Sequence, residues 1–212
     1  MKIKVCGLRE AGNIEVVAAL NPDYMGFIWY TQSPRYVYRL PEDVLHNLPA
    51  SIIKTAVFVN ENVDIMKVLI HQFGFNAVQL HGQESPEICA ELKQEVLVLK
   101  AFGVDEHFDF GQLQAYVGKV DYFLFDTKTD KHGGSGRIFN WDVLNEYQLD
   151  VPFFLSGGLS LDNLEEIKNI KHPAFYGVDL NSRFENSPGM KDINKLKQAF
   201  ALLNTTTNEI RS

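Results

Sequence analysis

The chain has 212 residues, of which 45% are hydrophobic and 22% are charged, and its formal net charge is −7. This size and composition suit one globular domain with a sizeable core, or two small ones. The acidic balance argues against a nucleic-acid partner, which would need a basic patch. With no secretory signal, no apolar run long enough to cross a bilayer and only two cysteines, we expect a soluble, cytoplasmic protein without disulfides.

Eight short apolar runs alternate with helix-like segments along the chain. The expected strands are residues 3–5, 24–28, 53–59, 77–80, 96–101, 122–125, 153–155 and 175–178. The expected helices include residues 63–73, 86–94, 142–147, 162–170 and 192–203, and the helical pattern is weakest over 105–117. Strand–helix alternation predicts parallel pairing through helical crossovers.

Eight such units in about 200 residues, with no linker between them, predict a single (β/α)8 TIM barrel over residues 1–212. Residues 204–212 are polar and are expected to form a frayed tail. An open doubly wound sheet is the alternative, but the first turn, at residues 6–9, lacks the glycine fingerprint typical of that fold.

Cys6 and Asp126 stand at expected strand ends, where barrel enzymes of this kind keep their chemistry. A carboxylic acid that is protonated near neutral pH can act as general acid, and an ionised thiol can act as general base. The alternatives are a small buried core residue at Cys6 and a turn-capping carboxylate at Asp126. Cys89 lies on an apolar helix face and is expected only to pack. Other polar residues at expected strand exits are Asn60, Gln79, His81, Lys100, Ser156 and Asp179.

Two glycine-rich or polar loops predict an anion site. Gly157 and Gly158 leave the seventh expected strand, and Asp179, Asn181 and Ser182 leave the eighth. Glycines let backbone N–H groups approach a phosphate closely, a helix N-terminus just beyond would add a favourable dipole, and these two loops are the usual phosphate site of this barrel class. Each loop alone could be an ordinary turn.

Three further features concern the walls of the expected pocket. Arg35, in a long loop among aromatic residues, can hold a carboxylate with two hydrogen bonds, or it can be a surface arginine beside a proline turn. His81 is expected at the pocket wall, because the six histidines show no zinc-like spacing. The glycine-rich segment 133–136 matches no nucleotide-binding motif and indicates a mobile lid within 127–137.

Several motifs occur together in one order over nearly the whole chain. They are KVCGL at 4–8, SPRYV at 33–37, VFVN at 57–60, VQLHG at 78–82, FDT at 125–127, GGSG at 133–136, LSGGL at 155–159 and GVD at 177–179, followed by Glu185, Pro188-Gly189 and Lys191-Asp192. In this joint spacing the chain resembles the phosphoribosylanthranilate isomerase family of tryptophan biosynthesis. After Gly177-Val178-Asp179 the family usually has two small residues and a glycine, whereas this chain has Leu180 to Phe184 with an arginine, Arg183.

The resemblance implies a barrel that needs no metal or organic cofactor and takes a small phosphosugar, as a monomer or homodimer. It implies an Amadori rearrangement in which Asp126 protonates the furanose oxygen and Cys6 removes the C2′ proton. Arg35 would then hold the anthranilate carboxylate, and the loops after the seventh and eighth strands the phosphate. The alternatives are another phosphosugar barrel enzyme, such as an epimerase, and a phosphosugar-binding module without catalysis.

Overall fold

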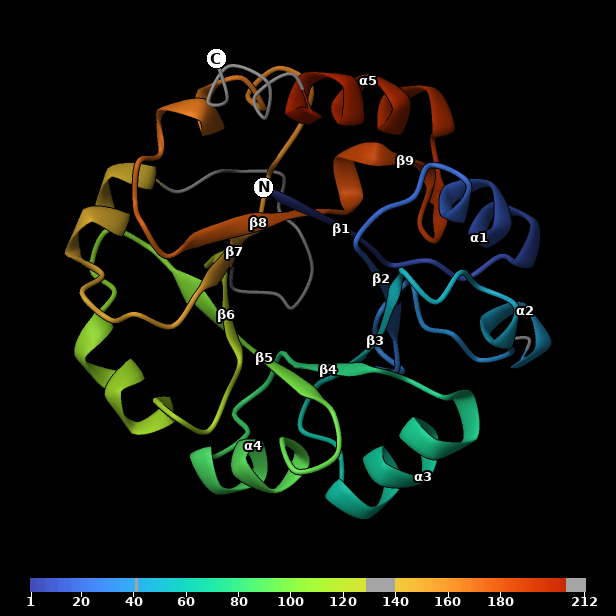
Figure 1. Cartoon of the computed structure of the whole chain (residues 1–212), viewed down its shortest axis with the longest axis horizontal. Coiled ribbons are helices and arrows are strands. Elements are labelled where there is room, and N and C mark those ends of the chain that lie inside the picture. Colours follow the sequence, from blue (N-terminus) through green and yellow to red (C-terminus); the bar gives the residue numbers. More distant parts are fainter. Residues whose placement is uncertain (41, 129–139, 205–212) are drawn as a thin grey trace.

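The computed structural model describes residues 1–40, 42–128 and 140–204, and its strands close into a parallel barrel surrounded by helices (Figure 1). The strands are β1 (Lys2–Cys6), β2 (Tyr24–Ile28), β3 (Ile53–Phe58), β4 (Ala77–Leu80), β5 (Leu97–Val104), β6 (Tyr122–Thr127), β7 (Phe153–Leu155) and β8 (Phe175–Leu180). Neighbouring strands pair in chain order, and β8 pairs with β1. This closing pair confirms the barrel and excludes the open sheet.

The helical segments on the outside of the barrel are less regular than the sequence predicts. The α-helices are α1 (Ala11–Ala18), α2 (Glu42–His46), α3 (Val63–Phe73), α4 (Pro86–Leu92) and α5 (Ile193–Asn204). The 3₁₀ segments are η1 (Phe110–Tyr116), η2 (Trp141–Glu146), η3 (Glu166–Asn169) and η4 (Ser182–Phe184). A short hairpin, β9 (Glu185–Ser187) and β10 (Met190–Lys191), follows β8 and η4.

The α-helices expected at 142–147 and 162–170 were wrong. The structure has the 3₁₀ segments η2 and η3 there, and η3 covers only Glu166–Asn169. Asp109 and Asn140 each accept a hydrogen bond from the backbone N–H two residues later, at the start of η1 and η2. Such local bonds compete with regular α-helix formation. The expected tail begins at Asn204, which instead ends α5, and the rest of that tail lies outside the described residues.

The predicted starts of α3 and α4 are correct. Asn62 caps α3 by accepting a hydrogen bond from the backbone N–H of Asp64 at 2.8 Å, and Gly74 ends the helix in the left-handed region at φ 60°. Ser85 caps α4, whose first turn contains Pro86. The hydroxyl oxygen of Ser85 accepts a hydrogen bond from the backbone N–H of Ile88 at a longer distance of 3.5 Å. No helix in the described ranges is long and apolar enough to cross a membrane.

Two apolar layers hold the barrel together. Alternate strand residues point inward, where a compact cluster is formed by Tyr24, Ala77, Leu99, Ala101, Leu124 and Phe154. The other strand residues point outward and join the larger core beneath the helices, together with Cys89, which is fully buried on α4 as predicted. Cys89 and Cys6 are both free, buried thiols.

Four strands, β1, β5, β6 and β8, run further than the sequence predicts, and the extension of β5 changes the expected role of Lys100. Because β5 continues to Val104, Lys100 is an interior strand residue and does not mark a strand exit. Its neighbours Leu99 and Ala101 belong to the inner cluster, so Lys100 faces outward, where it bonds to Glu84 at 3.1 Å in full burial. Lys100 is therefore a buried support of the loop after β4 and does not line the barrel mouth.

Candidate active site

Cys6 is the last residue of β1 and is only 2% exposed. It lies on the same face of the strand as Lys4, because side chains two residues apart share a face. On the neighbouring strand Gly26 stands directly opposite, and a Cβ built on Gly26 would lie 2.6 Å from the sulfur of Cys6. The absence of a side chain at Gly26 therefore provides the space that the thiol occupies.

Asp126 lies near the end of β6, on the inward face that Leu124 also uses. One of its oxygens, Oδ1, accepts a hydrogen bond from the backbone N–H of Thr127 at 2.9 Å. The other, Oδ2, lies 3.5 Å from Nε2 of His81, which follows β4. Because β4 and β6 are separated by β5 in the sheet, this contact passes over the end of β5 at the C-terminal end of the barrel.

His81 has a second partner that orients its ring. Nε2 of Gln79 lies 2.8 Å from Nδ1 of His81, and an amide nitrogen can only donate. With the Gln79 amide in this assigned orientation, Nδ1 accepts and the ring carries its proton on Nε2, the nitrogen that faces Asp126. The sequence predicted His81 at the pocket wall, but it gave no sign of Gln79 as the residue that sets the tautomer.

Asp179 interacts electrostatically with both expected catalytic residues. It is 4% exposed on β8, and its Oδ2 accepts a hydrogen bond from Nζ of Lys4 at 2.9 Å. Its charge interacts with Cys6, and the charge of Asp126 acts on Asp179 in turn. Cys6 and Asp126 therefore lie within electrostatic reach of one buried carboxylate at the same end of the barrel.

The thiol of Cys6 is subject to opposing influences. Burial raises its pKa above the ordinary value, while the ammonium groups of Lys4 and Lys191 act to lower it and Asp179 acts to raise it. Burial prevails, so the pKa lies above the ordinary value. A base at this position therefore depends on its neighbouring cations.

Arg35 is held by an acidic partner that the sequence did not indicate. Its guanidinium donates from Nε and Nη2 to the carboxylate of Glu185, at distances of 2.8 to 3.0 Å. Glu185 also accepts a hydrogen bond from Nζ of Lys191 at 2.7 Å, so two cations share one carboxylate. A Cβ built on Gly7 would lie 2.7 Å from Cδ of Arg35, which places the guanidinium stem against the turn that follows Cys6.

The loop after β7 contacts the expected acid directly. Gly157 and Gly158 both have positive φ, at 84° and 67°. A Cβ on Gly157 would lie 2.5 Å from Oδ1 of Asp126 and 2.4 Å from the backbone nitrogen of Thr127. The helix N-terminus expected just beyond this loop is absent, because Ser160 starts a turn and η3 begins only at Glu166.

The loop after β8 is fixed by Lys191. Nζ of Lys191 donates to the side-chain oxygen of Asn181 at 2.8 Å and to its carbonyl at 3.3 Å. Ser182 begins the short segment η4, in which Arg183 is exposed. A Cβ on Gly7 would lie 2.6 Å from Oδ1 of Asn181, so this loop meets the turns that carry Cys6 and Arg35.

Polar atoms without partners gather at the strand ends. Oε1 of Gln79, Oγ1 of Thr127 and Oδ1 of Asp179 are buried and make no hydrogen bond within the described part of the chain. Buried polar groups in proteins are nearly always paired, so the two of these atoms that lie on the inward face, Oε1 of Gln79 and Oδ1 of Asp179, point to a ligand that would satisfy them.

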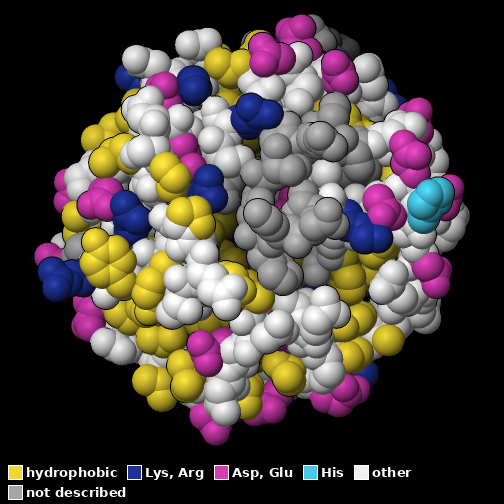
Figure 2. Space-filling model, turned by 180° about the vertical axis from the view of Figure 1, so that it is seen from behind, with side chains coloured by type: hydrophobic (Ala, Val, Ile, Leu, Met, Phe, Trp, Pro, Cys, Tyr) yellow, Lys and Arg dark blue, Asp and Glu magenta, His cyan; other side chains and the backbone are white. Residues whose placement is uncertain are grey.

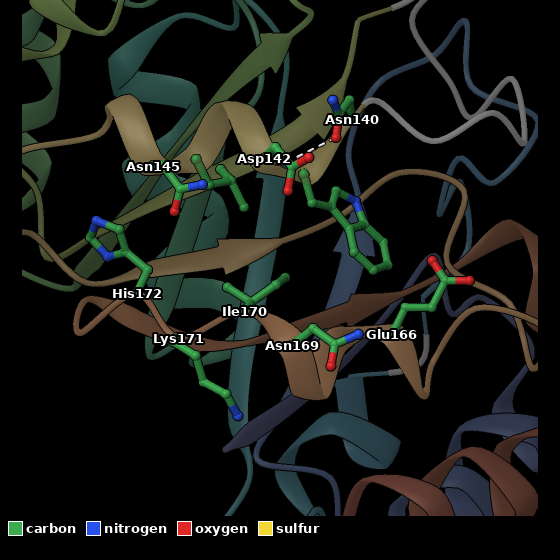
Figure 3. Close-up of a pocket in the computed structure, with 10 residues that line it drawn as sticks. Asn140, Asp142, Asn145, Glu166, Asn169, Ile170, Lys171 and His172 are labelled. Atoms are coloured by element: carbon green, nitrogen blue, oxygen red, sulfur yellow. Dashed lines mark hydrogen bonds between the residues drawn. The ribbon is translucent and has the colours of Figure 1, made fainter.

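A separate cavity of about 450 Å³ lies outside the barrel, between η2 and η3 (Figure 3). Its wall includes Asn145, Glu166, Lys171 and His172, and none of the expected site residues lines it.

On the described surface in Figure 2, basic side chains stand apart from one another among acidic ones. The expected lid at 133–136 lies outside the described residues, and the described residues contain no group of three or more metal-ligating side chains.

The fold and these residues define a (β/α)8 barrel whose mouth can serve acid–base chemistry on a small ligand. The family model for N-(5'-phosphoribosyl)anthranilate isomerase matches residues 3–201. An N-(5'-phosphoribosyl)anthranilate isomerase of Parabacteroides distasonis is 46% identical over 200 residues, covering 93% of this chain and 90% of that protein. The chain belongs to this isomerase family.

Solved structures agree with this assignment. The phosphoribosylanthranilate isomerase of Thermotoga maritima is 30% identical with a TM-score of 0.85, covering 97% of this chain and 99% of that one. Another isomerase of the family, 27% identical with a TM-score of 0.81 and the same coverage, was solved with reduced 1-(o-carboxyphenylamino)-1-deoxyribulose 5-phosphate bound.

Proposed function

We propose that this protein catalyses the Amadori rearrangement of N-(5'-phosphoribosyl)anthranilate to 1-(2-carboxyphenylamino)-1-deoxyribulose 5-phosphate, with Asp126 as general acid and Cys6 as general base. The observation that carries the proposal is that both side chains lie at the same end of the barrel within electrostatic reach of Asp179. Family membership supports the same reaction.

The reaction requires one proton to be given and one to be taken. Asp126 gives its proton to the furanose ring oxygen, the bond from that oxygen to C1′ breaks, and the sugar opens to a Schiff base. The Cys6 thiolate then takes the proton from C2′, and the electron pair forms the C1′–C2′ double bond of an enolamine. Tautomerisation of the enolamine gives the ketose, so the substrate and product are isomers and no redox partner is needed.

The substrate carries a carboxylate and a phosphate, and the site offers a partner for each. Arg35 holds the carboxylate through Nη1 and the second N–H of Nη2, since Glu185 accepts from Nε and from one N–H of Nη2. Gly157, Gly158 and Ser182 hold the phosphate through backbone and hydroxyl groups. A relative solved with a reduced carboxyphenylamino-deoxyribulose phosphate supports a ligand that carries both groups.

His81 and Asn181 complete the wall around the sugar. His81 directs Nε2–H toward Asp126 and the substrate, and Asn181 stands between the phosphate loop and Arg35. Asp179 contributes to the site through Lys4. We also infer a reduced cytoplasmic setting from the two free thiols, and a monomer or homodimer as the working form.

Substitution of the two catalytic groups tests the proposal. Cys6→Ser and Asp126→Asn should each lower kcat by roughly 10² to 10⁴-fold on N-(5'-phosphoribosyl)anthranilate, with the circular dichroism spectrum unchanged. Cys89→Ser, which alters the other buried thiol, is the matched control and should keep full turnover. Normal turnover by the Cys6 or Asp126 variant refutes the assigned role.

Substrate binding is tested separately. Arg35→Ala should mainly raise KM, because the carboxylate is not the reacting centre. A chain that binds the product analogue but never turns over substrate would favour a binding module, and loss of activity on adding a chelator would favour an epimerase-like enzyme.

A further inference from the structure

A buried thiol base needs a source of positive charge. Burial, with a smaller contribution from Asp179, raises the pKa of Cys6, but the thiolate is the form that removes a proton. The charged groups that act on the sulfur are Lys4 from its own strand, Asp179 from β8 and Lys191 from β10. Gly26, on the strand at its other side, brings no charge.

The strand β1 places Lys4 near the sulfur of Cys6. It stands two residues before Cys6, about 7 Å along the same inward face of β1, and it is fully buried. Its ammonium has three N–H donors and gives one hydrogen bond to Asp179. It also interacts with the sulfur of Cys6.

Asp179 keeps Lys4 in its charged form. Burial acts to lower the pKa of Lys4, but the carboxylate of Asp179 and the sulfur of Cys6 outweigh it, so the pKa stays above the ordinary value. The register places Lys4 and Asp179 directly opposite each other on β1 and β8, which fixes their separation through backbone pairing. Lys4 is therefore in its ammonium form when the thiolate that it faces is present.

Lys191 acts differently on the same sulfur. Its three hydrogen bonds go to Asn181 and Glu185, so it serves mainly to hold the loop after β8. Lys4 has no comparable loop to support, since both it and Asp179 are strand residues whose backbone is already paired.

The geometry points to Lys4 as the residue that stabilises the Cys6 thiolate for proton abstraction, with Asp179 holding the Lys4 ammonium in place. This inference rests on the proposed role of Cys6 as the base. Lys4 acts through Cys6 and is a positioning residue, not a group that touches the substrate.

The test follows the ultraviolet absorbance of the Cys6 thiolate during a pH titration. A difference titration against Cys6→Ser removes the signal of Cys89, whose pKa burial raises to about 11. Lys4→Met should raise the pKa of Cys6 by at least about one unit, as expected for loss of a neighbouring opposite charge. The limb of the kcat profile that reports ionisation of Cys6 should move with it, while KM stays unchanged.

Two further variants keep the test decisive. Lys4→Met leaves Asp179 unpaired in the barrel and can therefore prevent folding. The double variant Lys4→Met/Asp179→Asn replaces the ion pair with a neutral pair. It should also raise the pKa of Cys6, but by less than Lys4→Met. The control is Lys100→Met/Glu84→Gln, which neutralises an equally buried pair on the outer side of the barrel and should leave the Cys6 titration unchanged.

The outcomes separate this inference from the proposed function. If Cys6 titrates identically in the wild type and in the folded Lys4 variants, the role of Lys4 is overturned, even if Cys6→Ser is inactive. If Cys6→Ser turns over normally, the base assignment fails, and the role of Lys4 in proton abstraction fails with it, whatever the thiol titration shows.

Discussion

Gly157→Ala should displace the proposed acid, Asp126, without changing its chemical identity. A Cβ at this position would lie 2.4 Å from the backbone nitrogen of Thr127 and 2.5 Å from Oδ1 of Asp126, whereas ordinary contact begins at 3.4 Å. Relief of the overlap requires a shift of about 1 Å, and the atoms that must move are the carboxylate of Asp126 and the backbone that holds it.

The size of the effect follows from that shift. A misplacement of about 1 Å in a catalytic group costs on the order of 10²-fold in rate, or about 2.7 kcal/mol of transition-state stabilisation. Gly157 also has φ of 84°, so any side chain there adds about 1 to 3 kcal/mol of backbone strain to the folded state. The strain affects stability, and the displacement affects kcat.

Gly118→Ala separates the two effects. Gly118 has φ of 80°, nearly the same as Gly157, but a Cβ there meets nothing within 4 Å. Urea unfolding should show both variants destabilised by strain, and steady-state kinetics should show a lower kcat for Gly157→Ala alone. If both variants had wild-type kcat, the contact between the loop after β7 and Asp126 would have no part in positioning the acid.

Three other predictions concern stability. Asn62→Ala should lower the free energy of unfolding by about 1 kcal/mol, because α3 loses its cap, and kcat should be unchanged; no loss in urea melts would contradict the cap. Glu84→Ala leaves the buried Lys100 ammonium unpaired and should cost about 3 to 5 kcal/mol by the same measurement, whereas the neutralising pair of substitutions should cost less. Burial lowers the pKa of Lys191 from 10.5 to about 8, so between these values the unfolded chain binds more protons than the folded one. The free energy of unfolding should therefore gain up to about 3 kcal/mol from this group as pH rises through that window, and Lys191→Met should remove the gain.

The sequence predicted the strands better than the helical segments, for a physical reason. Strands such as Tyr24–Ile28 and Phe153–Leu155 are short apolar runs buried on both faces, so composition alone marks them. The stretch at 162–170 has a helical pattern of apolar residues, but Ser160 and Asn163 bond to nearby backbone and only η3 forms. Local side-chain bonds of this kind leave no clear periodic signal.

The sequence predicted which residue types stand at the strand ends. It did not predict which side chains in the site pair with one another. Cys6 and Asp126 were identifiable because each stands where a parallel strand finishes. The bond from Arg35 to Glu185 joins residues 150 positions apart, and that from Lys4 to Asp179 joins residues 175 apart. Such partners become visible only once the barrel closes.

The residue types at positions 6 and 26, which are partners on the neighbouring strands β1 and β2, depend on each other. Since the sulfur occupies the volume that a methyl group at Gly26 would fill, the two positions are expected to vary together among related barrels. Directed evolution that seeks a bulkier base at position 6 should begin from the glycine-bearing background, and libraries that randomise residue 26 alone should return glycine.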